Sequence, residues 1–205
     1  MHYRTEQEAF WLGDFGDAYR ERNRGRQLTA RKAAFFATAL RGAANLDSIC
    51  ELGCNIGLNL SALASLSEFQ LTGVEINPAA AKEAQELGVA DVQVASVLDD
   101  LSALGQFDLT FTMGVLIHSN PDYLQSVYHN LVRLSRRYVL VCEYYNPAPV
   151  SVPYRGHQDR LFKRDFAGEL IDSFGLELVD YGFVYRRDNH AAMDDFTWFL
   201  VRKEA

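Results

Sequence analysis

Residues 48–60 read Ser48-Ile-Cys-Glu-Leu-Gly-Cys-Asn-Ile-Gly-Leu-Asn-Leu60, and this stretch decides the expected fold. An apolar run ends at Glu51, a turn containing Gly53 and Gly57 follows, and a helical pattern then begins. A second apolar run ends in another acid, Glu75, about 20 residues beyond the turn. In a doubly wound α/β sheet this combination holds a nucleoside-containing cofactor. The glycines let the backbone approach the ligand, and the second acid accepts hydrogen bonds from ribose hydroxyls.

The spacing of the glycines distinguishes among cofactors. A dinucleotide site requires G-x-G-x-x-G, whose middle glycine admits a pyrophosphate. This chain has E-x-G-x-x-x-G, in which Asn55 stands at the place of that glycine, and no Walker lysine follows. The pattern resembles the first motif of class I S-adenosylmethionine-dependent methyltransferases. The alternative is an ordinary strand-to-helix turn in which Asn55 only caps the helix.

The composition is that of a globular protein with a single domain, expected to span residues 1–205. The 205 residues are 48% hydrophobic and 23% charged, which allows a substantial core. No apolar stretch approaches the length of a membrane span. The first residues lack the basic and apolar segments of a signal peptide, so we expect a cytoplasmic protein.

The charge and the cysteines narrow the range of ligands. A net charge of −7 argues against nucleic-acid binding, which needs a positive surface. Cys50, Cys54 and Cys142 follow no metal-ligand spacing, so we expect reduced thiols and no metal site. Basic clusters at residues 20–32 and 155–164 suit a small anionic ligand. We therefore expect a small-molecule substrate, with no nucleic acid and no membrane as partner.

Strand and helix patterns alternate through the middle of the chain. Strands are expected at residues 48–52, 71–76, 91–95, 107–112 and 138–142. The Asn-Pro pairs at residues 77–78 and 120–121 predict helix starts, because asparagine caps a helix and proline suits its first turn. This alternation predicts a parallel sheet.

The two ends of the chain show other patterns. Residues 1–44 have aromatic residues at helical spacing, interrupted by a polar stretch, and are expected to form a helical lid over a sheet core of residues 45–205. Near the end, a helix is expected at residues 162–174 and a pair of strands at residues 176–185 and 196–202. A final antiparallel strand is the usual ending of the methyltransferase fold. The expected fold class is therefore α/β, a Rossmann-like methyltransferase fold with a mostly parallel seven-stranded sheet.

Ligands of an open α/β sheet lie outside the carboxyl ends of its strands. The cofactor-binding candidates at these ends are Glu51, Gly53, Cys54, Asn55, Gly57, Glu75, Ile76, Ser96, Val97 and Met113. Asp99 either contacts an adenine edge or only solvates a loop. His118 is a base, a substrate contact or a packed ring. Of Tyr144 and the adjacent tyrosine, strand alternation points only one inward.

Methyl transfer from a sulfonium needs an apolar, preorganised site. Holding the reactants in line supplies roughly 7–11 kcal/mol, whereas a general base adds only about 10²–10⁴-fold in rate. The absence of an obvious catalytic triad therefore does not argue against this chemistry. Aromatic faces stabilise a sulfonium. Six aromatic residues that either converge over the cleft or pack in the core are Trp11, Tyr19, Tyr144, Tyr181, Phe183 and Tyr185.

Two polar groups of residues are candidates for anion recognition. The first contains Arg155, His157, Arg160, Lys163 and Arg164, and it either binds a carboxylate or phosphate or is a solvated loop. The second contains Tyr19, Arg22 and Asn23, which are expected to close the lid and bind the methionine carboxylate of the cofactor.

Longer segments carry a more specific resemblance. They are residues 6–19 with Arg22-Asn23, 51–60, 73–77, 114–118, 143–147, 153–169, 180–185 and 195–200. On these segments nearly the whole chain is similar to the pseudaminic acid biosynthesis-associated methylase family, which are class I methyltransferases. Met113 and Ser119 depart from the family, which has a basic and an apolar residue there. Both border the expected cleft, so they put the identity of the substrate in doubt.

The resemblance implies an S-adenosylmethionine-dependent methyltransferase acting on a sugar or natural-product intermediate. The candidates for the reaction are His118, Tyr144 and Tyr181. The candidates for substrate binding are Trp11, Asn146, Arg155, His157, Arg160, Phe183 and Tyr185. One alternative is an intramolecular cyclase that forms azetidine-2-carboxylate and methylthioadenosine from the same cofactor. The other is a non-catalytic, cofactor-binding regulator.

Overall fold

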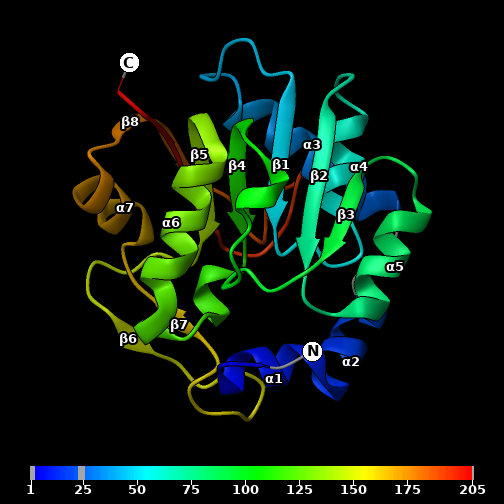
Figure 1. The fold of residues 1–205 in the computed structure, drawn as a ribbon, viewed down its shortest axis with the longest axis vertical. Coiled ribbons are helices and arrows are strands. Elements are labelled where there is room, and N and C mark those ends of the chain that lie inside the picture. The colour runs from blue at the N-terminus through cyan, green and yellow to red at the C-terminus, as the bar shows by residue number, and fades with distance from the viewer. Residues whose placement is uncertain (1–2, 23–25, 205) are drawn as a thin grey trace.

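A seven-stranded sheet forms the centre of the protein (Figure 1). The computed structural model describes residues 3–22 and 26–204. The strands are β1 (Ser48–Leu52), β2 (Gln70–Glu75), β3 (Asp91–Val94), β4 (Phe107–Met113), β5 (Ser135–Glu143), β8 (Glu177–Phe183) and β9 (Thr197–Arg202). They lie in the order β3-β2-β1-β4-β5-β9-β8. The first five are parallel and β9 is antiparallel to both of its neighbours, which confirms the expected fold.

Helices cover both faces of this sheet. One face carries α3 (Arg26–Ala39), α4 (Leu58–Ala64) and α5 (Pro78–Glu86), and the other carries α6 (Leu124–Leu134) and α7 (Phe166–Phe174). Successive strand residues serve opposite faces, as in β5, where Leu140 packs with the first group and Val139 and Val141 with the second. A strand covered on both faces is apolar throughout, which explains the continuous apolar run of β5.

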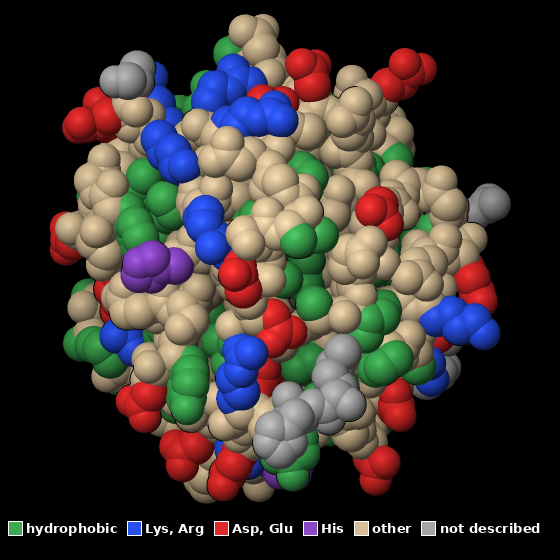
Figure 2. Space-filling view, in the orientation of Figure 1, with side chains coloured by type: hydrophobic (Ala, Val, Ile, Leu, Met, Phe, Trp, Pro, Cys, Tyr) green, Lys and Arg blue, Asp and Glu red, His purple; other side chains and the backbone are tan. Residues whose placement is uncertain are grey.

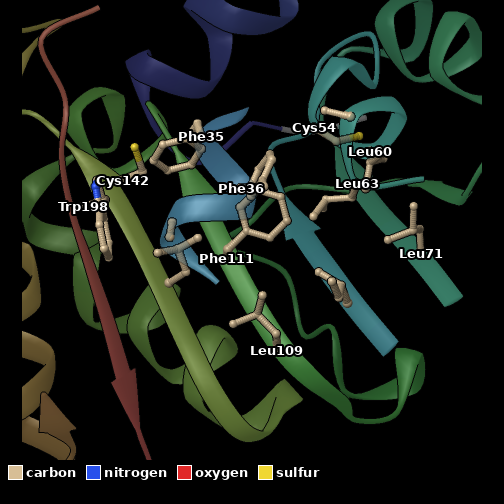
Figure 3. Packing of buried hydrophobic residues seen from close by; sticks show 14 of the residues in the cluster. Phe35, Phe36, Cys54, Leu60, Leu63, Leu71, Leu109, Phe111, Cys142 and Trp198 are labelled. Carbon is tan, nitrogen blue, oxygen red and sulfur yellow. The ribbon is translucent and has the colours of Figure 1, made fainter. Parts of the chain in front are cut away.

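The helix α3 belongs to this layered core. Phe35 and Phe36 point from α3 onto the sheet, as Figure 3 shows, and the rings of Phe36 and Phe111 lie 5.4 Å apart. Phe36 is fully buried. Among the helices before β1, α1 (Glu6–Leu12) and α2 (Asp14–Arg22) lie across the carboxyl ends of the strands, below the arrowheads in Figure 1. We call α1 and α2 the roof, and it is shorter than the lid expected at residues 1–44.

The starts of two helices differ from the sequence prediction. The helix expected from residue 162 begins at Phe166, because the side chain of Asp165 caps it by accepting a hydrogen bond from the Gly168 N–H (2.8 Å). Phe162–Lys163 instead forms β7, which pairs with β6 (Val150–Ser151). At residue 121 the chain first makes a short 3-10 helix (Pro121–Tyr123) that leads into α6.

Candidate functional site

A cavity of about 180 Å³ opens at the carboxyl ends of the parallel strands. The strand ends line it with Gly53, Cys54, Asn55, Glu75, Ile76, Ser96, Val97 and Met113. The roof contributes Trp11, Gly16 and Tyr19, and α3 contributes Lys32. Most residues predicted to bind a cofactor therefore come together at the place that the sheet topology predicts. Glu51 and Gly57 lie behind this lining.

Backbone conformation and close packing explain why the turn after β1 has glycine at residues 53 and 57. Gly53 and Gly57 have φ angles of 84° and 77°, a region that side chains disfavour. A Cβ on Gly53 would lie 2.5 Å from a methyl group of Val115. The Gly53 and Cys54 N–H groups donate to the carbonyl oxygen of Val74, which fixes the turn against β2. Asn55 also has a positive φ of 48° and serves the turn, without capping α4.

Glu75 is buried at the end of β2 and is held by two backbone donors. Asn55 N–H donates to one carboxylate oxygen (2.7 Å) and Asn77 N–H to the other (2.8 Å). Burial raises the pKa of Glu75, and these backbone hydrogen bonds oppose the rise. A carboxylate has about four acceptor positions, so two remain for ligand hydroxyls. This arrangement fits the ribose of a nucleoside.

The end of β3 is tied to the roof. Ser96 Oγ donates to the Glu8 carboxylate of α1, and Ser96 N–H donates to Asp99 (2.9 Å). Arg4 pairs with the same Asp99 carboxylate (2.7 Å). Asp99 does not line the cavity, and its carboxylate holds the loop after β3 through Ser96 N–H and Arg4. Ser96, Val97 and Leu98 line the cavity here.

His118 lies in the wall of the cavity, after β4. Its Nδ1 is 2.6 Å from the carbonyl oxygen of Arg160, and its ring lies 4.9 Å from Trp11 and 4.8 Å from Tyr154. Burial lowers the pKa of His118 to about 4, so the ring is neutral near pH 7. A carbonyl only accepts, so Nδ1 carries the proton and Nε2 has a free lone pair.

The carboxylate of Glu143 holds the loop that leads to His118. It accepts hydrogen bonds from the N–H groups of Val115, Leu116 and Ile117 (3.1, 3.1 and 3.3 Å). Burial raises the pKa of Glu143 to about 7, although these three donors oppose the rise. Glu143 at the end of β5 therefore fixes the conformation of the segment after β4 that forms this wall of the cavity.

A buried polar chain joins α3, α4 and β1 on one side of the cavity. Lys32 Nζ donates to Asn59 Oδ1 (2.7 Å), and Asn59 Nδ2 donates to a Glu51 carboxyl oxygen. Burial raises the pKa of Glu51 to about 8, opposed by Asn59 and the charge of Lys32. Burial also lowers the pKa of Lys32. Glu51 therefore supports Asn59 from behind and does not touch the cavity.

Three aromatic candidates lie far from the cavity. Tyr181, Phe183 and Tyr185 belong to β8 or the residues after it and are 65%, 60% and 46% exposed. The strand β8 is the outer strand of the sheet, separated from β4 by β5 and β9, so its side chains cannot reach the cavity. Tyr144 stacks on Phe196 (5.1 Å between centroids) and is also outside the lining. Of the six expected aromatic residues, Trp11 and Tyr19 line the cavity.

The basic loop contacts the roof instead of the cavity. Arg160 pairs with Glu6 of α1 (3.1 Å), and its guanidinium lies over the Phe10 ring (5.5 Å). His157 contacts the same ring (5.0 Å between centroids). Arg155 is exposed at the turn of this loop. The loop therefore supports the roof from outside.

The other expected binding residues are placed as follows. Asn146 bonds within its own loop, through its side chain to the Ala148 carbonyl oxygen, and does not line the cavity. Arg164 pairs with Glu169 (2.6 Å). Arg22 ends α2, but its side chain and the whole of Asn23 lie outside the described residues.

Several cavity residues were not predicted from the sequence. Lys32, Asn59 and Glu8 all line the cavity. The segment Thr5-x-x-Glu8 is a capping box, which indicates a helix start but not a site. Lys32 lies in the basic cluster at residues 20–32 and Asn59 in the segment 48–60, but only the packing of α3 against α4 shows that both side chains reach the cavity.

Residues 3–22 and 26–204 contain neither a cluster of metal ligands nor a helix that could span a membrane. In these ranges no three His, Cys, Asp or Glu side chains are placed to hold a metal ion. No described helix has the length and apolar character needed to span a membrane. All three cysteines are buried, free thiols. Acidic and basic side chains are interspersed over the face in Figure 2, without one extended positive surface.

Comparisons with known proteins agree with this architecture. Residues 49–137 match a family model described as a methyltransferase domain. The chain is similar to Burkholderia thailandensis 1,6-didemethyltoxoflavin-N1-methyltransferase, with a TM-score of 0.75 and 16% identity over 100% of this chain and 92% of that one. It is also similar to magnesium protoporphyrin IX methyltransferase from Synechocystis PCC 6803, with a TM-score of 0.70 and 15% identity over 97% and 100% of the two chains. No curated protein matches in a sequence search.

The fold and the matched segment together define the class of protein. At these identities the solved structures establish the fold, and the family match places a methyltransferase domain on residues 49–137. Residues 49–137 therefore carry a methyltransferase domain, and the two similar methyltransferases are structures with bound S-adenosylhomocysteine.

Proposed function

We propose that this protein transfers the methyl group of S-adenosylmethionine to an oxygen or nitrogen atom of a sugar or natural-product intermediate. The observation that carries the proposal is the continuity of the cavity, which Glu75, Gly53 and His118 all line. A cofactor whose ribose binds Glu75 therefore lies in the same space as a side chain that accepts protons. The resemblance to the pseudaminic acid-associated methylases supports a sugar-like acceptor.

Each part of the cavity has a role in holding the cofactor. Glu75 binds the ribose hydroxyls through its remaining acceptor positions. Ile76 and Val97 pack against the adenine, and Ser96 lies at its edge. When bound, S-adenosylmethionine supplies an electrophilic methyl group on a positively charged sulfur. Trp11 and Tyr19 of the roof exclude water and present aromatic faces.

His118 orients the acceptor and receives its proton at Nε2. Because its pKa is about 4, the ring is a weak base toward an unreacted hydroxyl group. It suffices once the new bond has made that proton strongly acidic. Its main contribution is therefore to hold the nucleophile in line, since positioning is worth roughly 7–11 kcal/mol.

The roof limits the size of the acceptor. Thr5, Glu8 and Trp11 of the α1 segment line the cavity. The roof is tied down because Asn77 donates to Asp17 of α2 (3.1 Å). A small molecule fits under this roof, whereas a folded macromolecule would need α1 to leave.

The test is product analysis with purified protein. Small molecules retained through purification identify acceptors by mass spectrometry, and these are incubated with S-adenosylmethionine. We expect a methylated acceptor together with S-adenosylhomocysteine. Methylthioadenosine formed without any acceptor would instead support the cyclase. Cofactor binding with neither product, combined with capture of a partner enzyme, would support a regulator.

A further inference from the structure

Lys32 places a cationic group in the wall of the cavity. It projects from α3, and its Nζ lies 2.7 Å from Asn59 Oδ1 and 3.5 Å from the sulfur of Met113. An ammonium group has three donors, and a thioether is a weak acceptor. Within the described part of the chain no carboxylate forms an ion pair with this ammonium group. The ammonium group is therefore held in place and keeps donor capacity for a ligand in the cavity.

The neighbours of Lys32 hold it in place without neutralising it. Asn59 Nδ2 donates to the buried Glu51 carboxyl group, which fixes the orientation of the amide and turns Oδ1 toward Lys32. The negative charges of Glu51 and Asp194 favour the ammonium form of Lys32, but among the described residues neither carboxylate makes an ion pair with it. A buried charge without a partner is costly, so such a site favours an anion that completes it.

The order of the strands shows which part of the cofactor lies beside Lys32. The strands β3, β2, β1 and β4 are adjacent in this order. At or just after their carboxyl ends lie Ser96, Glu75, Gly53 and Met113, respectively. With the ribose at Glu75 and the adenine at Ser96, the remaining part of the ligand extends past Gly53 toward Met113. Lys32 lies at that end of the cavity.

We infer that Lys32 binds the carboxylate of the amino-acid portion of the cofactor, held in position by Asn59 and Glu51. The inference rests on the proposed function, because the ribose must lie at Glu75. It assigns the carboxylate to a residue of α3, in place of the expected Arg22 and Asn23. The carboxylate of the ligand would give the ammonium group an ion pair that the described residues do not provide.

The inference is tested by calorimetric titration with two nucleosides. S-adenosylhomocysteine carries the amino-acid portion, and methylthioadenosine lacks it. In Lys32→Met we expect the affinity for S-adenosylhomocysteine to fall roughly 10–100-fold, the size typical of a charged hydrogen bond. The affinity for methylthioadenosine should change less than about threefold. Lys82→Met, at an exposed lysine of α5, is the matched control and should alter neither affinity.

The outcomes separate this inference from the proposed function. If the wild type binds S-adenosylhomocysteine and Lys32→Met binds it equally well, the inference is wrong and the proposed function stands. Equal losses for both nucleosides would mean general damage to the cavity and would also reject it. If the wild type binds neither nucleoside, both are rejected. Decarboxylated S-adenosylmethionine should bind the wild type more weakly than S-adenosylmethionine does, and this difference should shrink in Lys32→Met. An undiminished difference would reject the inference.

Discussion

The Nδ1 atom of His118 lies 2.6 Å from the backbone carbonyl oxygen of Arg160. This contact sets the tautomer and leaves the Nε2 lone pair available. The side chain of Arg160 also pairs with Glu6 of α1, so the segment that orients the imidazole also supports the roof. Closure of the cavity and orientation of the proton acceptor are therefore linked through one residue.

Replacing His118 with glutamine should lower kcat roughly 10²-fold, the low end of the range for a general base, because the group is a weak base. The affinity for S-adenosylhomocysteine should stay the same. Since the pKa of His118 is about 4, the wild-type kcat should show no step due to this residue between about pH 5 and 8. His129→Gln is the control, because His129 makes a similar Nδ1 contact (2.7 Å) on the exposed side of α6. An unchanged kcat in His118→Gln would reject the role.

The stability of the protein should depend on pH through His118. Its pKa is about 4 in the folded protein and about 6.5 when unfolded. The unfolded chain therefore binds the proton more readily, and the free energy of unfolding falls as the pH drops from about 6.5 to 4. The loss is on the order of 3 kcal/mol. Glu143, whose pKa of about 7 is raised, gives an opposite slope, so the wild type is compared with His118→Gln by urea denaturation. Equal slopes for the two proteins would contradict the assignment.

Glu75→Gln should weaken the binding of S-adenosylhomocysteine roughly 10–100-fold. The amide has one acceptor oxygen, while both Asn55 and Asn77 present backbone N–H groups to the present carboxylate. One donor would face the new amide nitrogen, so we also expect the protein to lose about 1–3 kcal/mol of stability. Glu68→Gln, at an exposed acid, should affect neither quantity. Calorimetry and thermal denaturation measure both, and native affinity in Glu75→Gln would exclude the ribose contact.

Gly53→Ala should destabilise the protein by about 1–3 kcal/mol, through its positive φ and the clash with Val115. Val115→Ala removes the methyl groups that a Cβ at residue 53 would meet. The double variant should therefore recover part of the loss, but not the part due to φ. Chemical denaturation of the four proteins gives the coupling energy. Strict additivity would show that Val115 does not cause the restriction at this glycine.

The sheet core could be predicted from sequence because its signals are local. Apolar runs such as residues 138–142 predict strands, and the Asn77-Pro78 pair predicts a helix start that the structure confirms. The turn after β1 and the acid at Glu75 placed the cavity, because parallel strands bring their carboxyl ends to one edge. Boundaries failed where a side chain decided them, as Asp165 does for α7.

The site was only partly predictable, because the positions of aromatic and basic residues in the sequence do not show how far apart they lie in the folded protein. Tyr181 and Trp11 were both candidates because they are aromatic, yet Tyr181 lies on the outermost strand and is exposed. Arg160 appeared to be a ligand for an anion, and it instead pairs with Glu6. Lys32 was noted only as part of the basic cluster at residues 20–32, because its place in the cavity arises from the packing of α3 over α4.

The sequence by itself determined the alternation of strands and helices in the parallel core and the turn at Gly53 that faces Glu75, because hydrophobic periodicity, helix capping and backbone conformation act over a few residues. The tertiary structure decided which distant side chains share the cavity. Lys32, Glu8 and His118 come from segments far apart in the chain, and only the packing of helices on the sheet brings them to the same edge.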